Sequence, residues 1–260
     1  LPLHNPVSSL EIGITKGGSI SPAPPRPARR KSIVFYGTSI THGFSASRSG
    51  MTHVAMLGRT FNREVINLGF SGNGKGEAVV ANMTAEIDAS LFVLDFSQNN
   101  PDLNSLQQVY EPFLNTVRRK HPKTPIIAIT PIASANNNPK FQQFREHIRE
   151  VVGRHVKDGD GLLTLVEGYD LLGPNRLDGL VDGVHPNDLG FQWMADGLAP
   201  TVAKVLTLPP PVLVDDSKIT VTPATAAARR KQIIDFIWGP SGLPTAKPAV
   251  AADGTIAVKM

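Results

Sequence analysis

Short apolar runs alternate with longer stretches of mixed polarity between residues 31 and 206. The short runs are rich in β-branched and aromatic residues, a composition that is typical of buried strands. The longer stretches between them are typical of helices. The predicted strands cover 33–36, 65–68, 91–96, 126–130 and 162–166, and the predicted helices cover 51–61, 76–88, 103–120, 140–156 and 187–205.

Strands that alternate with helices predict a parallel sheet covered on both faces, with right-handed crossovers. We therefore expect an α/β fold, a three-layer α/β/α sandwich around a doubly wound, flavodoxin-like sheet of about five strands. Such a sheet gathers the loops that follow its strands along one edge, where ligands bind. Ser39, Gly72 and Asn99 each follow a different predicted strand, so we expect all three at that edge.

The two ends of the chain differ from this central region. In residues 1–30, Leu10, Ile12 and Ile14 alternate as in a half-buried strand, and a proline-rich linker follows them. We interpret residues 1–30 as a strand remnant plus linker, and residues 31–206 as the main domain.

Residues 207–260 open on a second proline-rich linker. Thr222 is a predicted N-cap, with Pro223 at the first helical position and Gly239 near the end of the helix. We therefore expect a linker plus a C-terminal helical extension.

Composition excludes several classes of protein. The 260 residues include no cysteine, which excludes disulfides, thiolate metal sites and a cysteine nucleophile. Basic residues number 26 and acidic ones 22, and the aromatic residues do not interleave with the basic clusters, which argues against nucleic-acid binding. No apolar run is long enough to span a membrane. The chain opens on Leu1 without a signal peptide, so we expect a processed protein or a piece of a longer one.

The first candidate for chemistry is Ser39, in a turn between Gly37 and Gly43 that directly follows the first predicted strand. Glycines allow a tight turn there. A serine in this place can act as a nucleophile, but it needs a base to take its proton. The alternative interpretation of Ser39 is a helix N-cap.

His185 is a candidate for that base, because a histidine titrates near neutrality and can accept the serine proton. Asp182, three residues earlier, can accept from the other ring nitrogen and orient the imidazole. Asp182 could instead be only a turn residue before Gly183. The presence of both sites in one chain favours the catalytic interpretation.

These motifs, with two more between them, resemble the SGNH, or GDSL-type, esterase family over roughly residues 31 to 206. The matching blocks are 37–39, where Thr38 replaces the aspartate of the family motif; 67–72; 97–100, where asparagine is the clean match; and Asp182 with His185. One subgroup of this family carries a small β-rich domain before the catalytic one, and residues 1–30 resemble its last strands.

The resemblance implies an esterase that needs no cofactor, with Ser39, Asp182 and His185 as the catalytic residues. It also implies an oxyanion hole formed by the backbone N–H groups of Ser39 and Gly72 and by the side chain of Asn99. Each donor has a plainer interpretation, since Gly72 lies in a predicted turn and Asn99 begins a predicted loop.

Two rival hypotheses remain at this point. Residues 69–76 spell G-x-x-x-x-G-K with Gly76 where a phosphate-binding loop has serine or threonine, and Asp95 ends a strand as a magnesium ligand would. This pattern predicts a nucleotide-binding protein but leaves Ser39 and His185 unexplained. The second rival is a catalytically inactive binding module of the same fold.

His42 and Arg48 are candidate substrate contacts, although a surface histidine and a solvated arginine would also explain them. The remaining histidines show no metal-ligand spacing, so no metal is expected. The loops at 42–50, 100–102 and 131–138 are mostly small and polar. They favour a short acyl group, acetyl first, and a hydroxylated alcohol such as a sugar.

Overall fold

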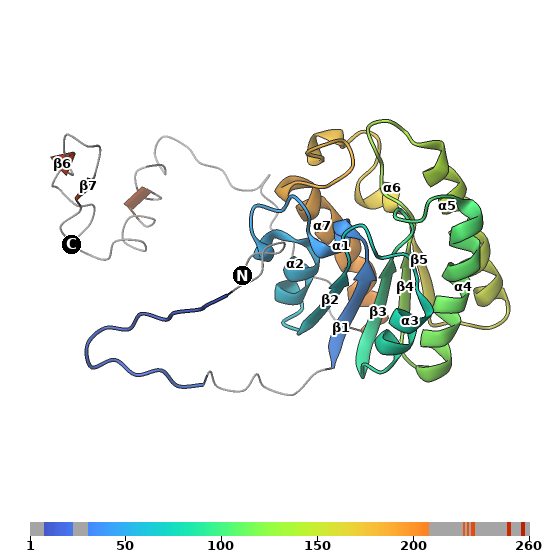
Figure 1. Ribbon diagram of the computed structural model, residues 1–260, viewed down its shortest axis with the longest axis horizontal. Coiled ribbons are helices and arrows are strands. Elements are labelled where there is room, and N and C mark those ends of the chain that lie inside the picture. The colour runs from blue at the N-terminus through green and yellow to red at the C-terminus, as the bar shows by residue number, and fades with distance from the viewer. Residues whose placement is uncertain are drawn as a thin grey trace. The chain divides into compact units, whose positions relative to one another are not determined.

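The computed structural model describes residues 8–22 and 31–207; beyond these it describes Ala226, Ala228, Arg230, Lys231, 249–250 and 256–257. Five parallel strands form the central sheet in the order β2-β1-β3-β4-β5 (Figure 1). The strands are β1 (Ser32–Gly37), β2 (Val65–Gly69), β3 (Ala89–Asp95), β4 (Ile126–Ile129) and β5 (Leu163–Val166).

Helices cover both faces of this sheet (Figure 1). The longer ones are α2 (His53–Thr60), α3 (Ala78–Ala85), α4 (Leu103–Lys120), α5 (Pro139–Lys157) and α7 (Asp188–Val205). The predicted three-layer α/β fold is confirmed, and each strand and helix predicted between residues 31 and 206 is present. Single turns that the sequence did not predict are α1 (Ser39–His42), α6 (Gly168–Leu171) and the 3₁₀ turns at Ser49–Met51 and Leu177–Gly179.

Alternate residues of each strand enter different cores, as the pleat requires. In β1, Ile33 and Phe35 pack with α2, α6 and α7, whereas Val34 and Tyr36 pack with α4 and α5. All four side chains are essentially inaccessible to solvent. Because β1 is covered on both faces and paired on both edges, its carboxyl end is a firm support for the turn that follows.

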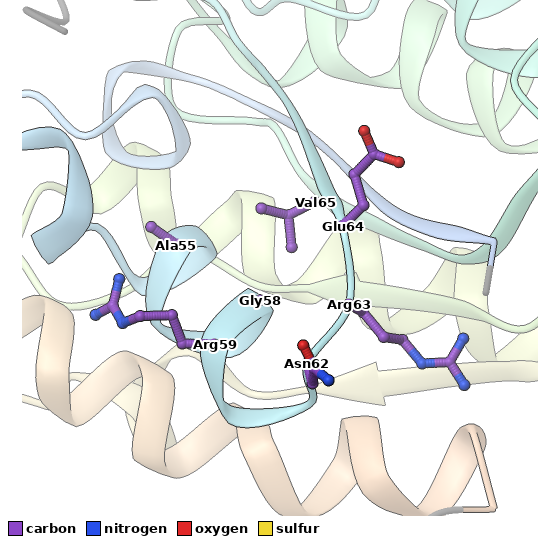
Figure 2. A pocket seen from close by; sticks show the side chains of 7 residues that line it. All are labelled: Ala55, Gly58, Arg59, Asn62, Arg63, Glu64 and Val65. Carbon is purple, nitrogen blue, oxygen red and sulfur yellow. The ribbon is translucent and has the colours of Figure 1, made fainter. Parts of the chain in front are cut away.

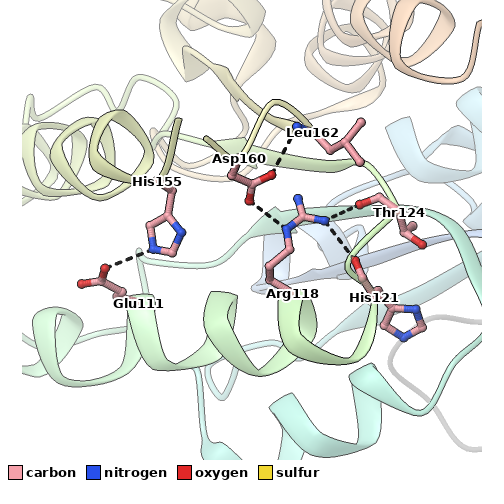
Figure 3. Close-up of polar contacts among 7 residues, drawn as sticks. All are labelled: Glu111, Arg118, His121, Thr124, His155, Asp160 and Leu162. Carbon is pink, nitrogen blue, oxygen red and sulfur yellow. Dashed lines mark hydrogen bonds and ion pairs between the residues drawn. The ribbon is translucent and has the colours of Figure 1, made fainter. Parts of the chain in front are cut away.

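A basic cluster, residues 118–120, lies in the last turn of α4, where cations suit the helix dipole. Arg118 donates to the carbonyl oxygens of His121 at 3.0 Å and Thr124 at 2.6 Å, and it pairs with Asp160 at 2.8 Å (Figure 3). Both members of the Arg118–Asp160 pair are largely buried. These contacts join the end of α4 to the segments that lead into β4 and β5.

The predictions for the two ends of the chain have different outcomes. The strand predicted around Leu10 is not formed in residues 8–22; Leu10, Ile12 and Ile14 are more than half exposed, and no described strand pairs with them. A strand without a neighbouring strand leaves its backbone N–H and C=O groups unpaired, which is unfavourable. The small β-rich domain expected before the catalytic one stays a prediction.

Residues 213–260 form a second compact unit. Most of the helix predicted to begin at Pro223 lies outside the described residues. The described positions there are helical at 226, 228, 230 and 231, and strands β6 (Ala249–Val250) and β7 (Ile256–Ala257) pair antiparallel.

Candidate active site

Ser39 is the first residue of α1, directly after β1. Gly37 must be glycine, because a Cβ atom there would lie 2.0 Å from Thr41 Oγ1 and 2.6 Å from the Asp95 carbonyl oxygen. The N-cap is Thr38, whose hydroxyl accepts from the amide of Ile40 at 3.3 Å. The alternative interpretation of Ser39 as a helix cap is therefore wrong, and its own hydroxyl is available to another partner.

That partner is His185. The distance from Ser39 Oγ to His185 Nε2 is 2.8 Å, and the distance from His185 Nδ1 to Asp182 Oδ2 is 2.7 Å. Asp182 also forms the turn that the alternative interpretation described, since its Oδ1 accepts from the amides of Val184 at 3.0 Å and His185 at 2.8 Å. One carboxylate thus shapes the loop and orients the imidazole.

These hydrogen bonds stabilise the ionised form of Asp182. Its partial burial raises the pKa, but the bonds from the His185 and Val184 amides and from the His185 ring outweigh that effect and lower the pKa to about 2. Asp182 is therefore ionised across the neutral range and can hold a proton on His185 Nδ1.

The loop that carries His185 is held by contacts from distant segments. The amide of Ala135 donates to the Gly183 carbonyl at 2.8 Å, and Leu180 and Pro186 form an isolated antiparallel bridge. Arg145 of α5, only 2% exposed, holds the neighbouring 131–138 loop. Its guanidinium donates to the carbonyls of residues 131 and 132, each at 2.8 Å.

The two other candidate residues lie in loops that contact the Ser39 turn. The amide of Phe70, two residues before Gly72, donates to the Gly37 carbonyl at 3.0 Å. Asn99 Nδ2 lies 3.4 Å from the Phe70 carbonyl, near the upper limit for a hydrogen bond. The ends of β1, β2 and β3 therefore bring the three predicted segments together.

The family of the chain follows from comparison with known proteins. The profile of the GDSL-like lipase/acylhydrolase family matches residues 30–203, more than half of the chain. The chain belongs to this family. A comparison with curated proteins gives no match.

Solved structures share the fold. A Bacteroides ovatus protein described as a GDSL-like lipase is 39% identical, with a TM-score of 0.62. The alignment covers 70% of this chain and 56% of that one. A salicylyl-acyltransferase, SsfX3, from a tetracycline biosynthetic pathway is 23% identical, with a TM-score of 0.63 over 71% and 57% of the two chains. This chain thus spans little more than half the length of either protein.

A third structure adds a sugar ligand to the comparison. It is a family two carbohydrate esterase from Clostridium thermocellum in complex with cellohexaose, and it is 20% identical with a TM-score of 0.58. The alignment covers 71% of this chain and 67% of that one. At this level of identity the likeness shows that the two proteins share the fold.

The departures from the family motif have physical substitutes. Thr38 caps α1 where the motif has aspartate, and both residue types are good caps. Asn100, where the family usually has aspartate, is buried, and its side chain donates to the Ser97 carbonyl at 3.3 Å. Lys140 of α5 donates to the carbonyls of Gln98 at 3.3 Å and Asn100 at 2.9 Å. The loop around Asn99 is therefore held in shape without the usual residues.

The phosphate-loop hypothesis is not supported by the loop itself. The amides that would bind phosphate are used internally, since Gly76 donates to the Tyr36 hydroxyl at 2.9 Å and Gly74 to the Phe70 carbonyl at 2.8 Å. Gly76 has a φ of +91°, and a Cβ atom there would lie 2.5 Å from the ring of Phe96. This glycine serves packing rather than a phosphate group.

His42 and Arg48 stay predictions as substrate contacts. His42 ends α1 with its backbone pressed against β2, where a Cβ atom on Gly69 would lie 2.1 Å from the His42 nitrogen. Arg48 is exposed, and it donates to Ser47 Oγ at 3.2 Å.

Phe44 is a residue that the sequence interpretation passed over, because the surrounding 42–50 loop is small and polar. Its ring centroid lies 4.5 Å from that of His185, and 37% of the residue is exposed. A single large aromatic residue in such a loop, five positions after Ser39, was the signal that could have identified it.

Other parts of the described chain show no second catalytic site or metal site. A pocket of about 780 Å³ is lined by residues at the end of α2 and the start of β2 (Figure 2). Ser39 instead follows the carboxyl end of β1, so the pocket lies at the other end of the strands. Among the described residues, no group of three or more histidine or acidic side chains could hold a metal ion. The described helices also include none that could cross a membrane.

Proposed function

We propose that the protein is a serine esterase that hydrolyses short-chain carboxylic esters through an acyl-enzyme on Ser39, within a catalytic domain at residues 31–206. The observation that carries the proposal is the hydrogen-bonded series from Ser39 Oγ through His185 to Asp182, at 2.8 and 2.7 Å. Nucleophile, base and orienting group in hydrogen-bond contact argue against an inactive binding module.

In the first half of the reaction, Ser39 Oγ attacks the ester carbonyl carbon while His185 Nε2 takes its proton. Asp182 stabilises the imidazolium that forms. The bond to the leaving oxygen then breaks, and His185 returns the proton to the departing alcohol. In the second half, water repeats the sequence on the acyl-enzyme and releases the acid and the free serine.

The oxyanion of each tetrahedral intermediate needs donors aimed at it. We assign this role to the Ser39 and Gly72 amides and to the side chain of Asn99. Within the described chain the Gly72 amide donates to no protein acceptor, and the hydrogen bond of Asn99 to Phe70 is long. Both groups are therefore available to a substrate oxygen.

The substrate that we favour is an acetylated carbohydrate. The polar loops around the site offer amides and hydroxyls to a sugar but no continuous apolar trough, although each buried methylene of a long acyl chain contributes about 0.8 kcal/mol. The likeness to a carbohydrate esterase points the same way by analogy.

The direct test is Ser39→Ala, assayed with an aryl acetate and with a fluorophosphonate label. We expect turnover to fall by at least ~10⁴-fold and labelling to disappear while the protein stays folded. Ser90→Ala is the matched control, because its hydroxyl bonds to the Ser32 carbonyl at the other edge of the sheet. Full activity in Ser39→Ala would rule out the serine mechanism.

A second assay tests the acyl preference on aryl esters from acetyl to decanoyl. We expect kcat/KM to be highest for acetyl. A maximum at the long-chain end would contradict the short-acyl proposal and favour a lipase.

A further inference from the structure

We propose that Phe44 determines which alcohol the enzyme accepts, by stacking its ring against a ring-shaped alcohol, a pyranose or an arene. This inference rests on the proposed function and deepens it. It starts from the contact between Phe44 and His185, whose ring centroids lie 4.5 Å apart at an interplanar angle of 49°.

The backbone holds Phe44 next to the reacting groups. Its amide donates to the carbonyl of Ser39 at 2.9 Å, so the residue is fixed to the nucleophile itself. Ser47 then anchors the loop on the other side, because its amide and hydroxyl donate to the two carboxylate oxygens of Asp188 at 2.9 and 2.5 Å. Asp188 is the first residue of α7 and follows His185 by three positions.

Phe44 is also more exposed than most aromatic residues of the domain. Most large aromatic residues of this domain are fully buried, whereas Phe44 is 37% and Phe70 41% exposed. An exposed aromatic face gains little stability from burial but can contact a ligand. Ser47 and Arg48 follow Phe44 by three and four positions in the same loop and are both exposed and polar, which suits a hydroxylated ring.

The chemistry assigns Phe44 to the alcohol side of the ester. His185 Nε2 must donate its proton to the leaving oxygen, so that oxygen lies within hydrogen-bond reach of the imidazole. The alcohol group attached to the leaving oxygen then lies beside the imidazole, and the Phe44 ring lies against the same imidazole. Phe70, by contrast, belongs to the loop of Gly72, and its carbonyl lies 3.4 Å from Asn99 Nδ2, on the side of the two proposed oxyanion donors.

If Phe44 contacts the alcohol, its effect is confined to the first half of the reaction. Every acetate ester gives the same acetyl-enzyme, and the alcohol has departed before water attacks. A residue that contacts only the alcohol therefore affects acylation, to a degree that depends on the alcohol, and leaves deacylation unchanged. A residue that only positions His185 affects both halves, because the histidine acts in both.

The experiment measures Phe44→Ala and Phe44→Leu with ethyl acetate, phenyl acetate and a mono-acetylated methyl pyranoside. We expect kcat/KM of Phe44→Ala to fall about tenfold for at least one ring ester and to stay within about twofold for ethyl acetate. Phe44→Leu, which keeps bulk but loses the flat face, should show the same order of preference. The deacylation rate constant should equal that of the wild type. Leu162→Ala removes an apolar side chain of similar exposure at the far edge of the sheet and is the control.

The pattern of losses decides the proposal. A loss confined to the pyranoside identifies a sugar as the preferred alcohol, and a loss confined to phenyl acetate identifies an arene. Equal losses on all three esters with slower deacylation would overturn the proposal, and so would no loss at all. The proposed function fails separately, if hydrolysis by the wild type does not depend on Ser39.

Discussion

The turn that carries Ser39 and the loop that carries His185 meet in one site, but they are held by different kinds of contact. The Ser39 turn continues a strand that is paired on both edges, and its neighbours Thr38 and Thr41 are almost completely buried. The His185 loop has no regular structure, and the side chain of Asp182 is 46% exposed. Its shape depends on a hydrogen bond to Ala135, on the bridge between Leu180 and Pro186 and on its own carboxylate.

The two halves of the site are therefore expected to respond differently to substitution. Changes near Ser39 disturb buried packing and are expected to appear as lost stability. Changes in the His185 loop are expected to displace the base, and a displacement of about 1 Å can cost ~10²-fold in rate without unfolding the protein. Four predictions test this comparison.

The largest effect is expected from Asp182→Asn. An asparagine keeps an acceptor for the amides of Val184 and His185, so the loop should retain its shape, but it cannot hold the imidazole in the required tautomer. We expect kcat to fall ~10⁴-fold with an unchanged melting temperature. Asp182→Ala, which also loses the loop contacts, should in addition lower the melting temperature. If both variants melt alike, the carboxylate does not shape the loop.

The second largest effect is expected from Asn99→Ala, which tests a loop beside the Ser39 turn. Loss of one oxyanion donor should lower kcat by ~10²–10³-fold with little change in substrate binding. If Asn99 is only a loop residue, stability should fall while turnover per folded molecule is retained. Steady-state kinetics combined with a melting curve distinguishes the two roles.

Gly183→Ala tests the His185 loop directly. Gly183 has a φ of +81°, and a Cβ atom there would lie 2.9 Å from Ala135 Cβ. Gly159 is a matched control, since its φ is +104° and nothing lies within 4 Å of its added Cβ. Both alanine variants should lose about 1–2 kcal/mol of stability from the left-handed backbone. Only Gly183→Ala should lose turnover, up to ~10²-fold. Equal activities would show that the loop tolerates the shift.

The smallest effect on catalysis is expected from Asp95→Asn, which tests the buried support of the Ser39 turn. Asp95 is 1% exposed, and burial raises its pKa to about 7, although a hydrogen bond from Thr41 at 3.2 Å partly lowers it. Between the ordinary aspartate pKa near 4 and about 7, the folded state therefore binds more protons than the unfolded state.

The stability of the wild type should accordingly fall as the pH rises through this window, by up to about 4 kcal/mol. Asp95→Asn removes this titration, so its stability relative to the wild type should increase from pH 4 to pH 8. Urea unfolding of both proteins at several pH values measures the difference. A constant difference across the window would show that Asp95 does not titrate there.

Much of the fold could be predicted from the sequence. The alternation of short apolar runs with helical stretches identified all five strands of the sheet. The reason is clearest for β1, β3 and β4, because strands that are buried on both faces consist almost entirely of apolar residues. Helix ends were less certain. The predicted helix 76–88 is shorter in the structure, where Gly76 takes a left-handed φ before α3 and the helix ends at Ala85.

The candidate site was predictable in part. Ser39 and His185 stood out because their residue types and turn positions suit nucleophile and base. Phe44 did not, since nothing local indicates that its ring meets His185. The hydrogen bond from Thr41 to Asp95 could not be predicted either. The sequence suggested that Asp95 is a metal ligand, whereas the structure has a buried carboxyl group there.

Local sequence patterns were enough to predict the parallel sheet, the end of the sheet at which its loops gather and the candidate residues Ser39, Asp182 and His185. Each of these follows from short-range patterns: apolar runs, glycines at turns and the choice of polar side chains beside them. The tertiary structure alone decided that Ala135 supports Gly183 and that Phe44 covers His185. These contacts join residues far apart in the chain, and no local pattern encodes a distance that exists only after the sheet and its helices have packed.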